Sequence, residues 1–207
     1  MTKHKKNFET VFCADKDWQA NACVGWSHDP LHLYVRGYKR AGDLLVEIVL
    51  NSNRDQDILI YPIAFLYRQY IELLLKEIII AGRKFLKESV KESDKPLTDH
   101  KIDILWDKAK KISMKIFKDE DDPLNFERSE NILMDFSRID SGSFSFRYPK
   151  TKKGKKTLEG LTHINIRRLA EHIEALSIDL ENISDGIAYK NEGRQQNEGR
   201  SQNEGPE

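Results

Sequence analysis

The sequence predicts an all-α fold, an antiparallel bundle of about five helices. Apolar residues recur at steps of three and four in several segments, which is the period of an amphipathic helix. One stretch, from Tyr61 to Ile80, is apolar for longer than any other part of the chain. No segment shows the long two-residue alternation that is typical of a half-buried strand. Together these patterns favour helices packed around one central helix.

The predicted central helix covers residues 61–87. Pro62 suits its first turn, where a missing backbone N–H has no intrahelical partner to lose. Between residues 71 and 80 apolar side chains occupy nearly every face, so we expect other helices to surround this one. Three charged residues at intervals of four form one polar stripe, namely Arg68, Glu72 and Lys76. They argue against a membrane span, because ionised groups are costly in hydrocarbon. The stripe is either a solvated edge of the helix or the first candidate for a functional site.

One further helix is predicted before the central helix. Asp29-Pro30 has the form of an N-cap followed by the first helical residue. Apolar residues then follow at helical spacing, up to a turn-forming cluster at residues 51–55. Gly37 and Gly42 each weaken this helix by about 1 kcal/mol relative to alanine. They can also allow another helix to approach closely.

Two shorter helices are predicted after the central one. Thr98 or Asp99 can cap the first, whose apolar face consists of Ile102, Leu105, Ala109, Ile112 and Ile116. The dipeptide Asp122-Pro123 predicts the start of the second, which runs to about Arg138. This second helix presents Phe126, Ile132, Leu133 and Phe136.

The last helix has the most regular period in the chain, with apolar residues at Ile166, Leu169, Ile173, Leu176, Leu180 and Ile183. Such a seam closes either the bundle or a dimer. After Ala188 a six-residue Asn-Glu-Gly repeat contains no apolar residue, which predicts a flexible tail. Residues 1–28 have scattered aromatic residues and no clear period, and we expect them to lie on the bundle. The predicted organisation is an N-terminal segment (1–28), a helical domain (29–187) and a tail (188–207).

Composition excludes few classes of function. Lys plus Arg and Asp plus Glu number 34 each, so the net charge gives no argument for a nucleic-acid partner. Charged residues make up 33% of the chain, which is typical of a helix-rich globular protein. Cys13 and Cys23 are too few for a disulfide framework. The lysine-rich N-terminus lacks the apolar region of a signal peptide, so the expected location is the cytoplasm.

Two groups of residues invite a metal-binding interpretation, but both are better explained otherwise. Structural zinc pairs usually lie two to four residues apart, whereas nine residues separate Cys13 from Cys23. His28 and His32 are four apart, but His28 precedes the predicted helix. The acidic run at residues 119–122 could bind Mg²⁺, although consecutive carboxylates are more often a solvated helix start. We therefore predict no metal site and no cofactor.

A local basic cluster follows a short aromatic segment at residues 144–149. Its members are Arg147, Lys150, Lys152, Lys153, Lys155 and Lys156. Lys and Arg side chains can neutralise several phosphates without reading the base sequence. The cluster therefore predicts contact with RNA or nucleotide, and the alternative is an exposed loop without a ligand.

Three stretches, taken in order, resemble HEPN domains (higher eukaryote and prokaryote nucleotide-binding). Residues 65–76 (FLYRQYIELLLK) resemble the family's helix in which a polar residue, a glutamate and a lysine stand among apolar residues. The stretch from His100 to Leu105 resembles the start of the family's following helix. Phe146-Arg147-Tyr148-Pro149 resembles the Arg-Tyr-Pro that often precedes its last helix. The resemblance spans roughly residues 31–185 and implies a HEPN-like bundle.

The resemblance also implies candidate catalytic residues. Many HEPN proteins are dimeric, metal-independent ribonucleases whose motif is Arg, four to six residues, then His. No histidine follows Arg147 at that distance, and the formal match is Arg167 with His172. On an ideal helix these two side chains lie about 140° apart, so a two-fold axis would have to bring them together. Arg167, His172 and Arg147 are the candidate catalytic residues.

Two functions follow from the resemblance. One is an RNA-binding or RNA-cleaving protein of a bacterial toxin-type or phage-defence system, dimeric and paired with an antitoxin or another defence protein. The other is a non-catalytic helical module that binds nucleotide or a partner protein, since many relatives lack the motif. The sequence leaves both alternatives open.

Overall fold

The computed structural model describes residues 11–25, 27, 30–88, 98–119 and 125–203, the last nine of these by backbone only. The chain divides into two units, Met1–Pro30 and Leu31–Glu207. The first contains the short 3-10 helix η1 (Trp18–Ala20). Large apolar side chains of this unit are exposed, including Val11, Phe12, Trp18 and Val24. That residues 1–28 lie on the bundle stays a prediction.

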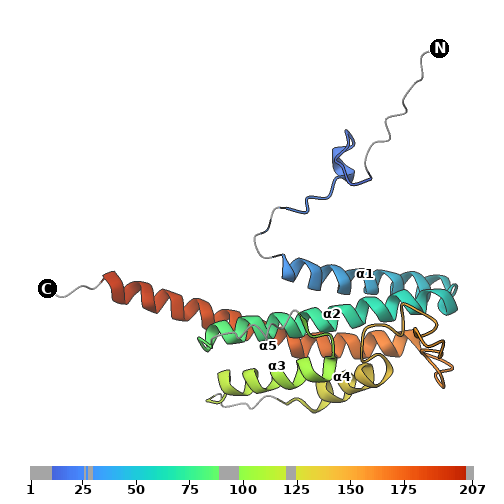
Figure 1. Ribbon diagram of the computed structural model, residues 1–207. Helices are drawn as coiled ribbons and strands as arrows, with labels where there is room; N and C mark the ends of the chain where they lie inside the picture. Colours follow the sequence, from blue (N-terminus) through green and yellow to red (C-terminus); the bar gives the residue numbers. More distant parts are fainter. Residues whose placement is uncertain (1–10, 26, 28–29, 89–97, 120–124, 204–207) are drawn as a thin grey trace. The chain divides into compact units, whose positions relative to one another are not determined.

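The second unit is an all-α bundle, as the sequence predicts (Figure 1). Its described residues form α1 (Leu31–Ser52), α2 (Gln56–Phe85), α3 (Ile102–Ile116), α4 (Glu127–Ile139) and α5 (Ile166–Asn203). Three residues join α1 to α2, and the two helices run antiparallel side by side. The central helix α2 packs on α1, α3 and α5, and α4 packs on α3 and α5.

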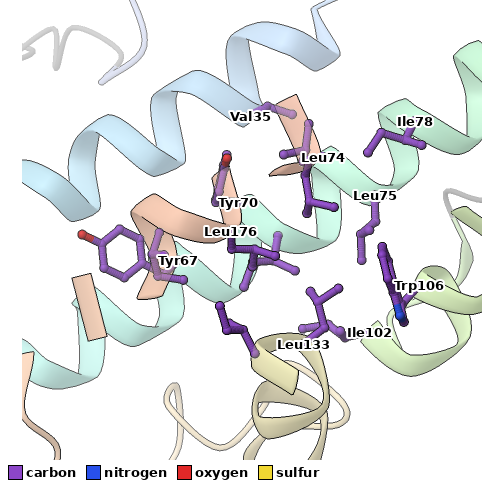
Figure 2. Packing of buried hydrophobic residues seen from close by; sticks show 14 of the residues in the cluster. Val35, Tyr67, Tyr70, Leu74, Leu75, Ile78, Ile102, Trp106, Leu133 and Leu176 are labelled. Atoms are coloured by element: carbon purple, nitrogen blue, oxygen red, sulfur yellow. The ribbon is translucent and has the colours of Figure 1, made fainter. Parts of the chain in front are cut away.

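The core is built around α2, which confirms the prediction for this helix. Its buried residues include Ile63, Tyr70, Ile71, Leu75 and Ile79, each 0% exposed. Figure 2 shows α2 side chains together with Val35 of α1, Ile102 and Trp106 of α3, Leu133 of α4 and Leu176 of α5. By length and composition alone α2 could cross a membrane. Its packing against α1, α3 and α5 accounts for its apolar length.

Pro62 lies inside α2 and not at its first turn, so the predicted start of this helix is wrong. The chain leaves α1 through two left-handed residues, Asn53 (φ 52°) and Asp55 (φ 63°), and α2 begins at Gln56. The early start places Leu59 and Ile60 against the core. Pro62 removes one backbone hydrogen bond, to the carbonyl four residues earlier. That carbonyl belongs to Ile58, which is exposed and can be hydrated.

Two glycines allow helices to approach closely. A Cβ on Gly42 of α1 would lie 2.7 Å from the Tyr67 ring, and one on Gly82 of α2 would lie 2.3 Å from Ile112 Cγ2 of α3. The close approach predicted for Gly42 is therefore confirmed. Gly37 is exposed, and no atom of the described residues lies within 4 Å of an added Cβ, so the same prediction is wrong for Gly37.

The starts of α3 and α4 differ from the predicted caps. All five apolar residues predicted for the face of α3 are buried. However, α3 begins at Ile102, and the Asp99 carboxylate pairs with Lys108 at 3.0 Å instead of capping the helix. At α4 the Asn125 side chain accepts a hydrogen bond from the Glu127 N–H. The predicted cap Asp122-Pro123 lies outside the described residues.

The seam of α5 closes the bundle. Ile166, Ile173, Leu176, Leu180 and Ile183 are buried, and Leu169 packs against the core. Asn165 caps the helix, because its side chain accepts the Arg168 N–H at 2.9 Å. That the chain forms a homodimer stays a prediction.

The helix α5 does not end at the predicted boundary of Ala188 but continues to Asn203. Ile187 is still fully buried, and the next turns hold two cations over core aromatics. Lys190 Nζ lies 5.5 Å from the Phe117 ring, and the Arg194 guanidinium lies 4.3 Å from the Phe85 ring. These contacts offset the helix-weakening glycines of the repeat.

Candidate functional site

The polar stripe predicted on the central helix is buried. Arg68, Glu72 and Lys76 are at most 2% exposed, so the solvated-edge interpretation is wrong. Glu72 accepts from both cations: Arg68 Nη1 lies 3.0 Å from Oε2, and Lys76 Nζ lies 2.7 Å from Oε1. A buried carboxylate is tolerated when it is paired and hydrogen-bonded, and both conditions hold here.

The surroundings keep Glu72 ionised. Burial alone would raise the pKa of Glu72, but hydrogen bonds from Lys76 and His100 and the charges of Lys76 and Arg68 outweigh it, so the pKa is lowered. For Arg68, burial lowers the pKa, Glu72 and Asp140 oppose that change, and the charge of Arg147 adds to it. The effect of Arg147 places its charge in the electrostatic neighbourhood of the buried stripe.

His100 covers this buried group from the side of solvent. Its ring Nδ1 lies 2.9 Å from Glu72 Oε1, while 63% of the side chain is exposed. Its backbone carbonyl accepts a hydrogen bond from Arg68 Nη2. The imidazole therefore has one edge fixed on a buried carboxylate and the rest of the ring in solvent.

The same arginine anchors the loop that follows α4. Arg68 Nε donates to the Asp140 carbonyl at 3.2 Å. The Asp140 carboxylate, itself buried, accepts the N–H groups of Phe144 and Ser145 at Oδ1. Its Oδ2 is buried and has no hydrogen-bond partner among the residues that the structure describes. Arg147 Nε then donates to the Ser143 carbonyl at 2.6 Å. One buried side chain thus holds both His100 and the loop that carries Arg147.

The basic cluster lies on a tight turn. Lys150 and Lys156 form an antiparallel β-bridge, and the Thr151 N–H donates to the Lys155 carbonyl at 2.8 Å. Gly154 has φ +79°, a conformation that glycine adopts without strain. All five lysines predicted for the cluster are exposed. The turn therefore presents several cations at the surface within seven residues of sequence.

A pocket of about 460 Å³ lies at the base of this turn. Cations and aromatic rings line it together, including Tyr61, Phe146, Arg147, Tyr148, Lys150 and Lys156. The Arg147 guanidinium lies 5.6 Å from the Tyr148 ring centroid and 5.7 Å from that of Phe65. Tyr61 and Tyr148 are each 49% exposed, so both rings are available to a ligand.

The motif pair of α5 lies elsewhere on the bundle surface. Arg167 and His172 are both exposed and flank the buried seam, as their helical spacing predicts. Arg168 is the nearer arginine, with its Nε 3.5 Å from His172 Nε2. That a second copy of the chain brings Arg167 to His172 stays a prediction.

A mixed-charge groove of about 830 Å³ runs between α1 and α5. It is lined by Arg36, Lys39 and Arg40 of α1 and by Glu174, Glu181 and Asp185 of α5. Two tyrosines of α2 reach the edge of this region: Tyr67 donates to Asp43 at 2.9 Å, and Tyr70 donates to Glu181 at 2.8 Å. Burial, aided by these acidic partners, raises the pKa of both phenols.

The metal-binding interpretations rejected from the sequence gain no support from the geometry. Cys13 and Cys23 are exposed and are not joined to each other by a disulfide. His28 and residues 120–122 of the acidic run lie outside the described residues. Within the described ranges, no three His, Cys, Asp or Glu side chains are grouped so that they could hold a metal ion.

No family model, curated protein or solved structure matches this chain in the comparisons made. The HEPN resemblance therefore rests on the three motif stretches, and it stays a prediction.

Sequence reasoning found the stripe and the basic cluster but missed their connection through Arg68. The sequence marks His100 only as the first residue of a stretch that resembles a HEPN helix start. Its partner Glu72 is 28 residues away in sequence, and no short-range spacing reports that contact. The signal available in the sequence was the resemblance, because Glu72 and His100 lie in two successive stretches that resemble HEPN segments.

Proposed function

We propose that this protein is a HEPN-like, RNA-directed protein of a bacterial toxin-type or phage-defence system, and that it binds single-stranded RNA at the turn formed by residues 147–156. The observation that carries the proposal is the shared lining of the 460 Å³ pocket by cations and exposed aromatic rings. Unpaired bases stack on aromatic side chains, and arginine and lysine neutralise the phosphates beside them. A polyanion with planar bases fits both halves of this lining.

A salt titration of RNA binding tests the proposal. We would measure fluorescence anisotropy of a fluorescein-labelled single-stranded RNA of randomised sequence. Affinity should fall steeply with salt, and each phosphate-contacting lysine replaced should reduce the salt slope by about 1. The variants are Lys150→Gln and Lys156→Gln, with Lys111→Gln on α3 as the matched control, since that lysine is exposed and pairs only with a neighbouring helical residue.

The aromatic half of the pocket has its own variant. Tyr148→Ala should weaken binding by about 1–3 kcal/mol at every salt concentration, because one stacked base is lost. Binding that ignores salt and is unchanged in the lysine variants would overturn the proposal.

A second candidate, a partner-binding module without catalysis, is favoured by the groove between α1 and α5. Its lining combines basic side chains of α1 with acidic side chains of α5, which suits a protein surface better than a polyanion. Replacing Arg36 and Arg40 together by glutamine should then weaken capture of a co-encoded protein while leaving RNA binding unchanged. If the double variant captured that protein as well as the wild type does, the groove would have no role in partner binding.

A further inference from the structure

We propose that His100, positioned by Glu72, is the acid–base group of an RNA-cleaving centre in this protein. The inference rests on the proposed RNA-directed function and adds a catalytic residue outside the Arg167–His172 motif. It starts from a geometry that a purely structural surface histidine does not require. One ring nitrogen is held by a buried carboxylate, and 63% of the side chain is exposed.

The contact with Glu72 fixes the tautomer of His100. Glu72 is ionised, so its oxygens only accept hydrogen bonds. The proton of the neutral ring must therefore sit on Nδ1, which lies 2.9 Å from Oε1. Nε2 is left with a lone pair on the side of the ring away from Glu72. A base for a hydroxyl proton needs such an accessible lone pair.

Glu72 is itself held in place and does not turn with the imidazole. Arg68 binds Oε2 and Lys76 binds Oε1, and all three side chains are buried. A carboxylate fixed in this way orients the imidazole and stabilises the imidazolium that forms after proton transfer. By this geometry Glu72 is a positioning residue.

The RNA-binding turn is tied to the same anchor. Arg68 donates to the carbonyls of both His100 and Asp140, and Asp140 organises the loop that leads to Arg147. Arg68 therefore connects His100 to the loop that carries Arg147 through a series of hydrogen bonds. The cations of the pocket would hold the phosphates that flank the cleaved bond.

The step is transesterification within the RNA chain. His100 Nε2 takes the proton of a ribose 2′-hydroxyl, and the 2′-oxygen forms a bond to the adjacent phosphorus. The bond from phosphorus to the 5′-oxygen breaks, and its electron pair stays on that oxygen. The 5′-oxygen takes a proton from water, and the resulting hydroxide takes the proton from the imidazolium. The products are a 2′,3′-cyclic phosphate and a 5′-hydroxyl.

His172 offers the matched alternative. It is exposed, and the contact that the structure gives its ring is Arg168 Nε at 3.5 Å. A guanidinium can only donate, so it cannot fix the donor tautomer that Glu72 imposes on His100. His172→Ala therefore tests this alternative, and His163→Ala, at an exposed histidine in the segment before α5, is the control variant for both.

The test combines cleavage, binding and chemical rescue. The probe is the same labelled RNA, incubated with the full chain in EDTA, and the ends are identified by mass spectrometry. The wild type should yield cyclic phosphate ends, and His100→Ala should cleave about 10²–10⁴-fold more slowly with unchanged RNA affinity. Added imidazole should restore part of the rate in His100→Ala, because the site beside Glu72 is then empty. His163→Ala should keep the wild-type rate, and His172→Ala measures what the α5 motif contributes.

The positioning role has a spectroscopic readout. Side-chain ¹⁵N chemical shifts of the neutral histidines should show Nδ1-protonated His100, assigned by the signal that His100→Ala removes. In the folded fraction of Glu72→Gln, the His100 ¹⁵N shifts should move toward those of a mixture of the two tautomers.

Several results would overturn the inference. They are a wild-type rate in His100→Ala, loss of cleavage in His172→Ala alone, absence of imidazole rescue, and RNA binding without cleavage by the wild type. The last of these leaves the proposed RNA-binding function intact. Absence of RNA binding would instead overturn the proposed function, and this inference with it.

Discussion

The buried charges of α2 and the exposed lysines of the turn at residues 150–156 are similar residue types in opposite surroundings. Arg68, Glu72 and Lys76 are at most 2% exposed and share hydrogen bonds, whereas the turn lysines stand in solvent. Burial makes each α2 charge depend on its partner, because the dielectric screening of water is lost. Exposure makes each lysine nearly independent of its neighbours but available to a polyanion. We therefore expect the first group to govern stability and, under the proposed function, the second to govern RNA binding.

The largest expected effect comes from removing the carboxylate in the buried group. Glu72→Gln keeps the shape of the side chain but leaves Arg68 and Lys76 without its charge. Breaking a buried ion pair in this way costs about 3–5 kcal/mol, a large part of the 5–15 kcal/mol that is typical of a whole domain. Urea unfolding should show a much lower midpoint with an unchanged m-value.

Glu159→Gln is the exposed counterpart. Glu159 pairs with Lys155 of the turn at 3.7 Å, and both side chains are at least 65% exposed. We expect no measurable change in midpoint, because exposed pairs contribute little. Equal effects of the two substitutions would remove the distinction drawn between the groups.

The charge pattern alone could not distinguish these two environments. A stripe at intervals of four looks the same on a solvated edge and on a face covered by α3 and the loop at residues 140–147. What decides burial is the contact of Arg68 with the carbonyls of His100 and Asp140, both more than thirty residues away. Local spacing carries no information about such contacts.

Helix identity was predictable because it depends on short-range periodicity. The seam of α5 and the apolar face of α3 are buried as predicted. Helix ends were less predictable, because a side chain that can cap also has other partners. Asp99 pairs with Lys108, and α5 extends past Ala188 where Lys190 and Arg194 find aromatic rings.

A second comparison sets a buried glycine, Gly82, against an exposed one, Gly37. Gly82→Ala would place a Cβ 2.3 Å from Ile112 Cγ2 in the contact of α2 with α3. We expect a loss of about 1–3 kcal/mol from overpacking, although alanine is the better helix former. The added Cβ of Gly37→Ala meets no atom within 4 Å in the described part of the chain, and this substitution should stabilise the protein by up to about 1 kcal/mol. Thermal unfolding of both variants measures the difference, and a stabilised Gly82→Ala protein would contradict the close packing of α2 on α3.

The pH dependence of stability reports on the buried charges of α2. The pKa of Glu72 is lowered in the folded protein, against an ordinary value of 4.5. Since the unfolded chain then binds the proton more readily, the contribution of Glu72 is present above about pH 4.5 and is lost as pH falls toward the folded pKa. Urea midpoints across this range should fall more steeply for the wild type than for Glu72→Gln. The pKa of Asp179 is also lowered, so part of the slope should remain in the variant.

The smallest expected effect lies where α5 passes the end of α2. Arg194 donates to the carbonyl of Phe85, the last residue of α2, and its guanidinium lies 4.3 Å from the Phe85 ring. A carbonyl at a helix C-terminus lacks an intrahelical partner, and a cation there also suits the helix dipole. Arg194 is exposed, so the contact should contribute only about 0.5–1 kcal/mol.

Arg194→Ala should lower Tm by no more than about 4 °C. The control is Arg167→Ala, at an exposed arginine on the same helix, which should leave Tm unchanged. Equal Tm values for the two variants would mean that the last turns of α5 add nothing to the bundle, and the boundary at Ala188 would then mark the end of the cooperative fold even though the helix continues.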